Sequence, residues 1–229
     1  MAFEGFSKDF FKFFRDIKKN NERPWFEANK ERYKEVVIAP IQDFIIALAP
    51  KLAKVSDQIR CDPRPNGGSM FRIYRDVRFS KDKSPYKTQA GIQFRHVHAK
   101  DFRAPGYYLH LAPGEVFFGG GMYMPEPPAL VMIRTAIAEK PAEWKKMLAA
   151  PGIKKFGGLG EFDTLTKPPR GFAPDNPLIE DIKRKSFFVT MDSSEEEAGK
   201  PAFVSQVAKT FGDAAPLMSF LCKAAGTKF

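Results

Sequence analysis

The chain has little cysteine and none in a regular pattern. Its 229 residues include two cysteines, Cys61 and Cys222, which form no CxxC pair. This count excludes a disulfide framework and a cysteine zinc module, and it is typical of proteins that keep reduced thiols. We therefore expect both thiols to be free and the protein to be cytoplasmic.

Targeting and membrane signals are also lacking. Glu4, Lys8 and Asp9 interrupt the first ten residues, where a secretory signal would need a basic start and then an unbroken apolar run. No stretch reaches the roughly 20 apolar residues of a membrane span. We expect a soluble protein with no membrane partner.

Linkers and internal repeats are not seen either. No Ser/Gly-rich, low-complexity or strongly charged segment divides the sequence, in which 43% of the residues are hydrophobic and 14% aromatic. A chain of this length can bury roughly 70% of the surface that it exposes when unfolded. The composition therefore predicts one domain over residues 1–229.

Helical periodicity marks both ends of the chain. Phenylalanines recur every three or four residues up to Ile17, after a good N-cap at Ser7, which predicts a helix that ends near residues 20–21. A second helix should begin at Pro24 and reach about residue 52, with a kink or break at Pro40. Further helices are expected over 202–211 and 216–225.

The middle of the chain changes to a two-residue period. Strands are expected over 91–97, 106–111 and 115–119, and Ala112-Pro113-Gly114 predicts a tight hairpin between the last two. Phe187-Phe188-Val189 is typical of a late edge strand. Together these elements predict an α+β fold with a central antiparallel sheet flanked by N- and C-terminal helices.

Positive charge is concentrated in the same middle region. Residues 61–110 contain ten Lys and Arg against four Asp and Glu, which is +6 of the chain's formal +10. Within it, Asp76 and Asp82 are the only acids between residues 72 and 87. The six cations there are Arg72, Arg75, Arg78, Lys81, Lys83 and Lys87. This excess predicts an anion site, with a phosphate-bearing or other anionic small molecule as the partner.

An extended conformation over 71–80 would sort these side chains onto two faces. The polar face would hold Arg72, Tyr74, Asp76 and Arg78. The other would hold Phe71, Ile73, Val77 and Phe79, with Arg75 intruding among them. Tyr74 and Tyr86 would line the site. If the protein catalyses a reaction on the bound anion, we expect Asp76 and His110 to act as the acid/base pair.

Two other interpretations remain open from the residues. In a nucleic-acid-binding module, Tyr74, Phe79 and Tyr86 would stack on bases. In a scaffold or partner-binding protein, the arginines would pair internally with Asp76 and Asp82. A narrow concave basic pocket favours the small anion, a long open basic stripe favours nucleic acid, and arginines buried against acids favour the scaffold.

A metal site is conceivable but is not our expectation. His96 and His98 would share a strand face, with His110 on the neighbouring strand. No carboxylate has clear ligand spacing near them, and histidines at a charged strand end are unremarkable. We predict no metal site.

Three segments resemble one known family. They are Asn20-Asn21-Glu22-Arg23-Pro24-Trp25-Phe26, the run from Phe71 to Lys87, and Gly106-Tyr-Tyr-Leu-His-Leu-Ala-Pro-Gly114. Pro169-Arg170-Gly171-Phe172, Pro177 and Lys185-Ser186-Phe187 look like a later motif. Together they resemble the conserved hypothetical proteins called domain of unknown function 2461, over nearly the whole chain.

This resemblance implies one domain, and it supplies no cofactor or reaction. By position, the motif residues are Trp25, Arg72, Tyr74, Arg75, Asp76, Arg78, Phe79, Ser80, Lys81, Asp82, Lys83, Pro85, Tyr86, Lys87 and His110. His96 and His98 fall outside the motif. Pro24 departs from the residue expected in the N-terminal motif, which affects only the local turn.

Overall fold

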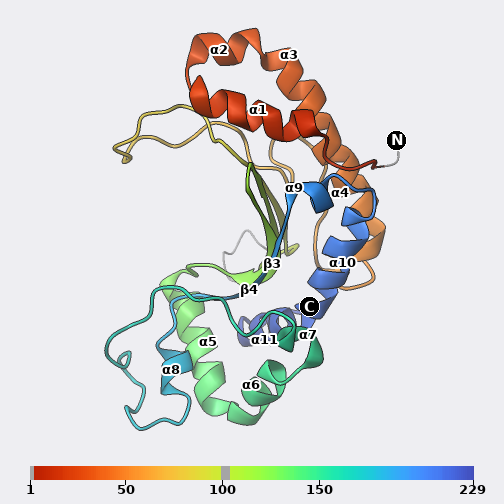
Figure 1. Ribbon diagram of the computed structural model, residues 1–229. Helices are drawn as coiled ribbons and strands as arrows, with labels where there is room; N and C mark the ends of the chain where they lie inside the picture. The colour runs from red at the N-terminus through yellow and green to blue at the C-terminus, as the bar shows by residue number, and fades with distance from the viewer. Residues whose placement is uncertain (1–2, 99–103) are drawn as a thin grey trace.

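The computed structural model describes residues 3–98 and 104–229, which form an α+β fold (Figure 1). Helices from both ends of the chain flank a four-stranded antiparallel sheet, as the sequence predicts. The elements in chain order are α1 (Lys8–Lys19), α2 (Arg23–Ala28), α3 (Lys30–Tyr33), the π-helical η1 (Lys34–Ile38), α4 (Ala39–Leu52), β1 (Ala90–Arg95), β2 (Gly106–Ala112), β3 (Glu115–Met122), α5 (Pro127–Glu139), α6 (Pro141–Leu148), α7 (Pro151–Lys154), α8 (Ile179–Ile182), β4 (Phe187–Ser193), α9 (Glu195–Ala198), α10 (Phe203–Asp213) and α11 (Ala215–Ala224).

Helix α1 forms where the phenylalanine spacing predicts it. The Ser7 hydroxyl accepts a hydrogen bond from the Phe10 N–H at 3.2 Å, and Asn20 is the C-cap. This cap satisfies one of the free N–H groups of the first turn. The phenylalanine side of the helix is buried in the core, so the expected helix and its packing are confirmed.

The second predicted helix is divided into four pieces. Helices α2 and α3, the turn η1 and helix α4 replace one helix kinked at Pro40. Pro40 lies in the first turn of α4, where a residue without an N–H is tolerated, and η1 directly precedes it. The helical backbone thus continues through Pro40, and the irregularity that Pro40 predicts is a π-helical turn directly before α4 and not a split of the helix.

The sheet has the strand order β1-β2-β3-β4, with every neighbouring pair antiparallel. Pro113 and Gly114 form the β2–β3 turn, where Gly114 has φ 78°, a left-handed conformation that glycine adopts without strain. Strand β4 is an edge strand, as predicted from residues 187–189, and it extends to Ser193.

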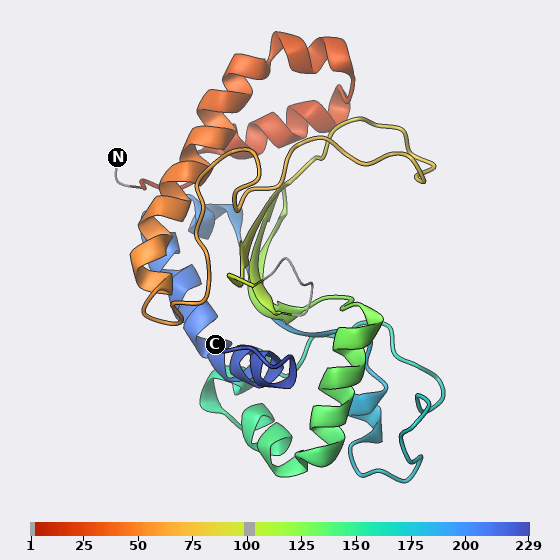
Figure 2. The same cartoon turned by 180° about the vertical axis from the view of Figure 1, so that it is seen from behind.

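One face of this sheet packs on the C-terminal helices. Tyr107 stacks on Phe211 of α10 with ring centroids 4.4 Å apart, and its hydroxyl donates to the Phe211 carbonyl at 2.9 Å. Phe118 packs on Phe203 and Phe211. Helix α4 lies behind α10, where Phe44 meets Phe203. The opposite face of the sheet is concave and is directed to the side on which the N-terminal helices and α5 are separated from each other (Figure 2).

Residues 71–89 leave the sheet as two antiparallel segments that project from the molecule (Figures 1 and 2). We call them the basic arm. A bridge pairs Tyr74 with Tyr86, and the Lys87 N–H donates to the Ile73 carbonyl at 2.8 Å. The expected apolar face over 71–80 is wrong at Phe79, which is 95% exposed. No second layer covers the arm there, so strand alternation does not bury its side chains.

Two further sequence expectations concern thiols and membranes. Cys61 and Cys222 are both free, as predicted. Within residues 3–98 and 104–229, no helix is both long enough and apolar enough to cross a bilayer. The expectation of one domain stays a prediction.

Candidate functional site

The base of the basic arm is fixed to the N-terminal helices through Tyr86. The Asn21 side chain donates to the Tyr86 carbonyl at 2.9 Å and accepts from the Tyr86 N–H at 3.0 Å. The Tyr86 ring is 2% exposed and stacks on Phe26 of α2, with centroids 4.3 Å apart. Asn21 thus pairs with the arm as a neighbouring strand would. Two of the segments that carry the family resemblance meet at this contact.

Both acids of the arm are paired with arginines. Asp76 accepts from Arg78 Nε at 2.9 Å and from Arg78 Nη2 at 2.7 Å, in a bidentate pair. Asp82 accepts from Arg75, and it also accepts from the Ser84 hydroxyl at 2.6 Å. These two arginines therefore pair with the acids as the scaffold interpretation expects, but the pairs are not buried, since the Arg78 side chain is 76% exposed and that of Asp82 is 60% exposed.

These pairs keep both carboxylates ionised. Hydrogen bonds from Arg78 lower the pKa of Asp76 to about 2. Hydrogen bonds from Ser84, followed by those from Arg75, lower the pKa of Asp82 to about 2. Near neutral pH, Asp76 holds no proton that it could donate, so it does not suit the role of a general acid.

The other four cations of the arm have no carboxylate partner among the described residues. Lys83 Nζ donates to the Val77 carbonyl at 2.9 Å, and Lys87 Nζ donates to the Arg72 carbonyl at 2.6 Å. Within the same part of the chain, neither Arg72 nor Lys81 has a hydrogen bond or ion pair through its side chain. The arm therefore keeps an excess of positive charge after its own acids are satisfied.

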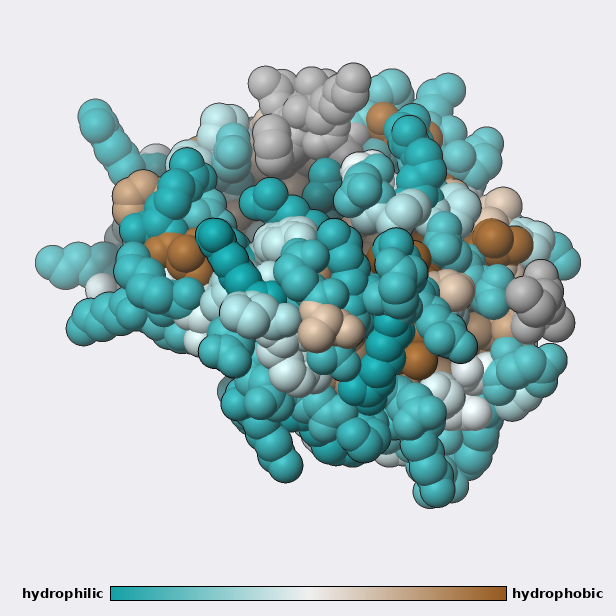
Figure 3. Space-filling view, turned by 90° about the horizontal axis from the view of Figure 1, so that it is seen from above, coloured by the Kyte–Doolittle hydropathy of each residue, from teal (hydrophilic) through white to brown (hydrophobic). Residues whose placement is uncertain are grey.

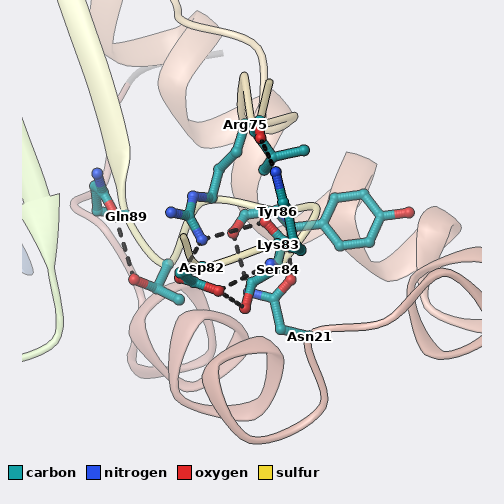
Figure 4. A network of polar contacts seen from close by, with 9 residues as sticks. Asn21, Arg75, Asp82, Lys83, Ser84, Tyr86 and Gln89 are labelled. Atoms are coloured by element: carbon teal, nitrogen blue, oxygen red, sulfur yellow. Dashed lines mark hydrogen bonds and ion pairs between the residues drawn. The ribbon is translucent and has the colours of Figure 1, made fainter. Parts of the chain in front are cut away.

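A groove of about 460 Å³ lies between the base of the arm and the end of α1. We call it the basic groove. Its lining residues are Lys18, Asn21, Arg75, Asp82, Ser84, Tyr86, Lys87, Thr88 and Gln89. Figure 4 shows Arg75 directed at Asp82, while the Tyr86 ring points away from this pair. Among the described residues, three cations and one carboxylate thus line this groove.

Lys87 is a cation of this groove with no carboxylate partner among the described residues, and its Nζ lies 5.5 Å from the centroid of the Phe71 ring. Its side chain is partly desolvated, and burial together with the neighbouring Arg72 lowers its pKa. A cation withdrawn from water without a counter-charge favours the binding of an anion beside it. Lys18 joins the groove from α1. Lys18 could not be predicted as a groove residue, because residue spacing cannot show that the last turn of α1 lies beside the arm.

His110 lies elsewhere, on the concave face of the sheet. Its Nδ1 is 3.2 Å from the Tyr108 hydroxyl, and its ring is parallel to that of Phe117, with centroids 4.6 Å apart. Glu115 Oε2 is 3.7 Å from Nε2. Burial lowers the pKa of His110, and the charge of Glu115 opposes this shift only in part. The imidazole is therefore neutral at pH 7.

The structure does not join Asp76 to His110. Their contacts are separate, and no hydrogen bond or ion pair links them among the described residues. The carboxylate beside His110 is Glu115, which sequence reasoning missed. Glu115 could have been predicted from the hairpin register. A turn at Pro113-Gly114 pairs His110 with Phe117, and it places Glu115 on the same face of the sheet as His110.

The other two histidines have structural contacts. His96 Nε2 is 2.7 Å from the Lys228 carbonyl oxygen, and the His98 N–H donates to His96 Nδ1 at 3.1 Å. In the part of the chain that the structure describes, no group of three His, Cys, Asp or Glu side chains is placed to hold a metal ion.

The sequence was also compared with known proteins and protein families. Comparison with curated proteins and with solved structures found no match. The family model described as conserved hypothetical protein, domain of unknown function 2461, matches residues 9–220, which include the whole basic arm, the basic groove and the sheet. The chain therefore belongs to the family of conserved hypothetical proteins called domain of unknown function 2461.

Proposed function

We propose that the protein binds a small phosphate-bearing anion in the basic groove. The observation that carries this proposal is the convergence of Lys18, Arg75 and Lys87 on one concavity that holds a single carboxylate, Asp82. Phosphate oxygens are good acceptors for a guanidinium and an ammonium held at fixed positions.

The groove residues would share the anion as follows. Arg75 uses Nη1 for Asp82 and for the Ser84 carbonyl, and we assign its Nε and Nη2 to the ligand. Lys87 Nζ donates one of its three hydrogens to the Arg72 carbonyl, so two remain for the anion. Lys18 supplies a third positive charge from the last turn of α1.

The outer cations of the arm have a different part in this proposal. Arg72, Arg78, Lys81 and Lys83 extend the positive field beyond the groove. Such a field raises the local concentration of an anion and its association rate, without a direct contact in the bound state. The free thiols of Cys61 and Cys222 support a cytoplasmic location for this binding.

Titration calorimetry with sodium pyrophosphate, at low ionic strength, tests the groove. The wild-type chain should bind it, and Lys87→Gln should weaken binding at least tenfold, because a hydrogen bond between charged groups contributes about 1.5 to 3 kcal/mol. Arg75→Lys should also weaken it, since an ammonium cannot reproduce the planar fork of a guanidinium.

Lys81→Gln is the matched control, since it removes the same charge from the same arm outside the groove. It should change the affinity less than threefold. If pyrophosphate does not bind the wild-type chain, or if Lys81→Gln and Lys87→Gln weaken binding equally, the groove is not the anion site. The arginine pairs would then serve as a scaffold.

Nucleic acid is the second candidate ligand, and the exposed rings of the arm favour it. Phe79 is 95% exposed and Tyr74 is 45% exposed, and the Arg78 guanidinium lies 5.8 Å from the centroid of the Phe79 ring. Tyr86 cannot stack on a base in this structure, because its ring is buried. The surface seen from the end that carries α1–α3 is largely hydrophilic, with only small separate hydrophobic patches (Figure 3).

Binding of single-stranded DNA and RNA as a function of salt tests this alternative. A module that neutralises several phosphates should lose affinity steeply as salt rises. Phe79→Ala should then weaken binding by about 1 to 3 kcal/mol, the contribution of one stacked base. Failure of both nucleic acids to bind at low salt would remove this candidate.

A further inference from the structure

The concave face of the sheet encloses a larger cavity than the basic groove does. Its volume is about 900 Å³, within the range of small-molecule sites. Phe71 at the base of the arm lines one part of it, and residues 122–126, which run from the last residue of β3 toward α5, line another. We call it the sheet cavity.

Glycine backbone forms part of the cavity wall. The strand register places Gly106 and Gly121 opposite each other, and Gly119 between Tyr108 and Thr190. All three line the cavity. A Cβ would lie 1.8 Å from the Val189 carbonyl oxygen at Gly119 and 2.2 Å from the Phe187 carbonyl oxygen at Gly121, so β3 and β4 tolerate no side chain at these two positions.

Aromatic side chains remain half-exposed around the glycines. Phe117 packs flat against His110, and its ring centroid is 6.0 Å from that of Tyr108. Phe71 lies on the other side of Tyr108, with centroids 6.2 Å apart. Phe188, on β4, also lines the cavity. Rings of this kind pack favourably against the flat face or the edge of another ring.

The charges of the cavity are opposite in sign to those of the groove. Among the residues that the structure describes, three carboxylates line it, those of Glu115, Glu126 and Asp192, against one guanidinium, that of Arg95. Arg95 Nε donates to Gln93 at 3.0 Å. An anion would meet repulsion here, whereas a cation over an aromatic ring gains from both the carboxylates and the ring.

We propose that the sheet cavity is a second ligand site, separate from the basic groove, which binds a flat aromatic molecule that is neutral or cationic. Its ring would pack against Phe117 and Tyr108 inside the sheet cavity. The carboxylates of Glu115 and Asp192 would lie around it and set the preferred charge.

Three probes with one ring system and three charges test this site in the full-length chain. They are N-methylquinolinium, quinoline and quinoline-2-carboxylate, and their affinities are measured by NMR titration at pH 7.5. The first two should bind, with N-methylquinolinium at least as tightly as quinoline. The carboxylate should bind at least tenfold more weakly than quinoline.

Two variants locate the binding in the cavity. Phe117→Leu keeps an apolar side chain but removes the ring, so it should weaken N-methylquinolinium at least fivefold. Phe79→Leu is the matched control on the exposed arm and should leave the affinity unchanged. Thr190→Phe places a ring above Gly119 and should block the cavity, which gives a second test if Phe117→Leu does not fold.

A variant with one carboxylate fewer tests whether the cavity prefers a cationic ligand to an anionic one. Asp192→Asn should narrow the difference in affinity between N-methylquinolinium and the carboxylate. The proposal is overturned if neither quinoline nor N-methylquinolinium binds, if the carboxylate binds most tightly, or if folded Phe117→Leu and Thr190→Phe both bind like the wild-type chain.

Discussion

The basic arm and the concave face of the sheet differ in almost every property. The arm is charged, projects from the molecule and is fixed mainly at its base, by Asn21, Phe26 and a short ladder. The sheet face is aromatic and hollow, and it is held by backbone pairing over its whole length. The density of charged motif residues along a chain therefore does not show where the chain forms the larger of these two cavities.

The first prediction concerns the rigidity of the sheet face and has the largest expected effect. Gly121 has φ 138°, and a Cβ there would lie 2.2 Å from the Phe187 carbonyl oxygen. Gly121→Ala should lower the free energy of unfolding by about 3 kcal/mol or more, through backbone strain and overpacking. Urea unfolding measures it.

Gly114→Ala is the control for this prediction. Gly114 also has a positive φ, 78°, but a Cβ there would have nothing within 4 Å. Its replacement should cost about 1 kcal/mol, from the left-handed conformation alone. If the two variants lose the same free energy of unfolding, the backbone of the sheet face adjusts to a new side chain as easily as an open turn does.

The second prediction contrasts the base of the arm with its exposed part. Tyr86→Ala removes a buried ring from Phe26 and should lower the free energy of unfolding by about 3 kcal/mol. Phe79→Ala, at a ring that is 95% exposed, should stay within about 0.5 kcal/mol of the wild type. Thermal and urea unfolding measure the stability of the two variants. If both lose a comparable free energy of unfolding, the arm is not fixed at its base and free in its outer part.

The third prediction concerns the side chain that pairs with the base of the arm. Asn21→Ala removes both hydrogen bonds to the Tyr86 backbone and should cost about 2 kcal/mol. The Tyr86 amide should also exchange its hydrogen faster. Asn20→Ala is the control, because the exposed Asn20 side chain donates to the Asp16 carbonyl of its own helix and has no hydrogen bond to the arm among the described residues. If the Tyr86 amide exchanges at the wild-type rate in Asn21→Ala, another contact holds the arm.

The fourth prediction, the smallest in effect, concerns pH. The pKa values of Asp76 and Asp82 lie near 2, below their unfolded value of 3.8, so the stability that they contribute is present above pH 4. It is lost as pH falls from 4 toward 2. Carbon NMR of the two carboxyl groups should show both midpoints near 2.

Arg78→Gln separates the two carboxyl groups. It should raise the pKa of Asp76 toward 3.8, because the Arg78 hydrogen bonds are the main cause of its low value, and leave that of Asp82 near 2. If the pKa of Asp76 does not move, the pair seen on the arm does not persist in solution.

The sequence predicted the elements whose side chains follow a single period. Helix α1 and the β2–β3 hairpin bury one side against a core, so spacing and turn residues suffice to locate them. The arm was harder to predict, because alternation along a segment shows two faces only where a second layer covers one of them. Phe79 is the residue at which that assumption fails.

The candidate sites were predicted only in part. The cations of the arm stand out in composition, and two of them, Arg75 and Lys87, line the basic groove. Lys18 reaches the groove through the packing of α1, which no local pattern encodes. Glu115 could have been found from the hairpin register. The sheet cavity is lined by residues of all four strands, whose shared face becomes visible only when the strands are paired.

The most direct test of a basic groove and a sheet cavity with opposite charge preference is one pair of NMR titrations. Pyrophosphate and N-methylquinolinium are added separately to the ¹⁵N-labelled full-length chain. Pyrophosphate should move the amide signals of Asn21, Lys87 and Thr88, and N-methylquinolinium those of His110 and Phe117, with little overlap. If both ligands shift the same set of amides, or if pyrophosphate moves those of the sheet face instead of the groove, the division of the molecule into two sites is wrong.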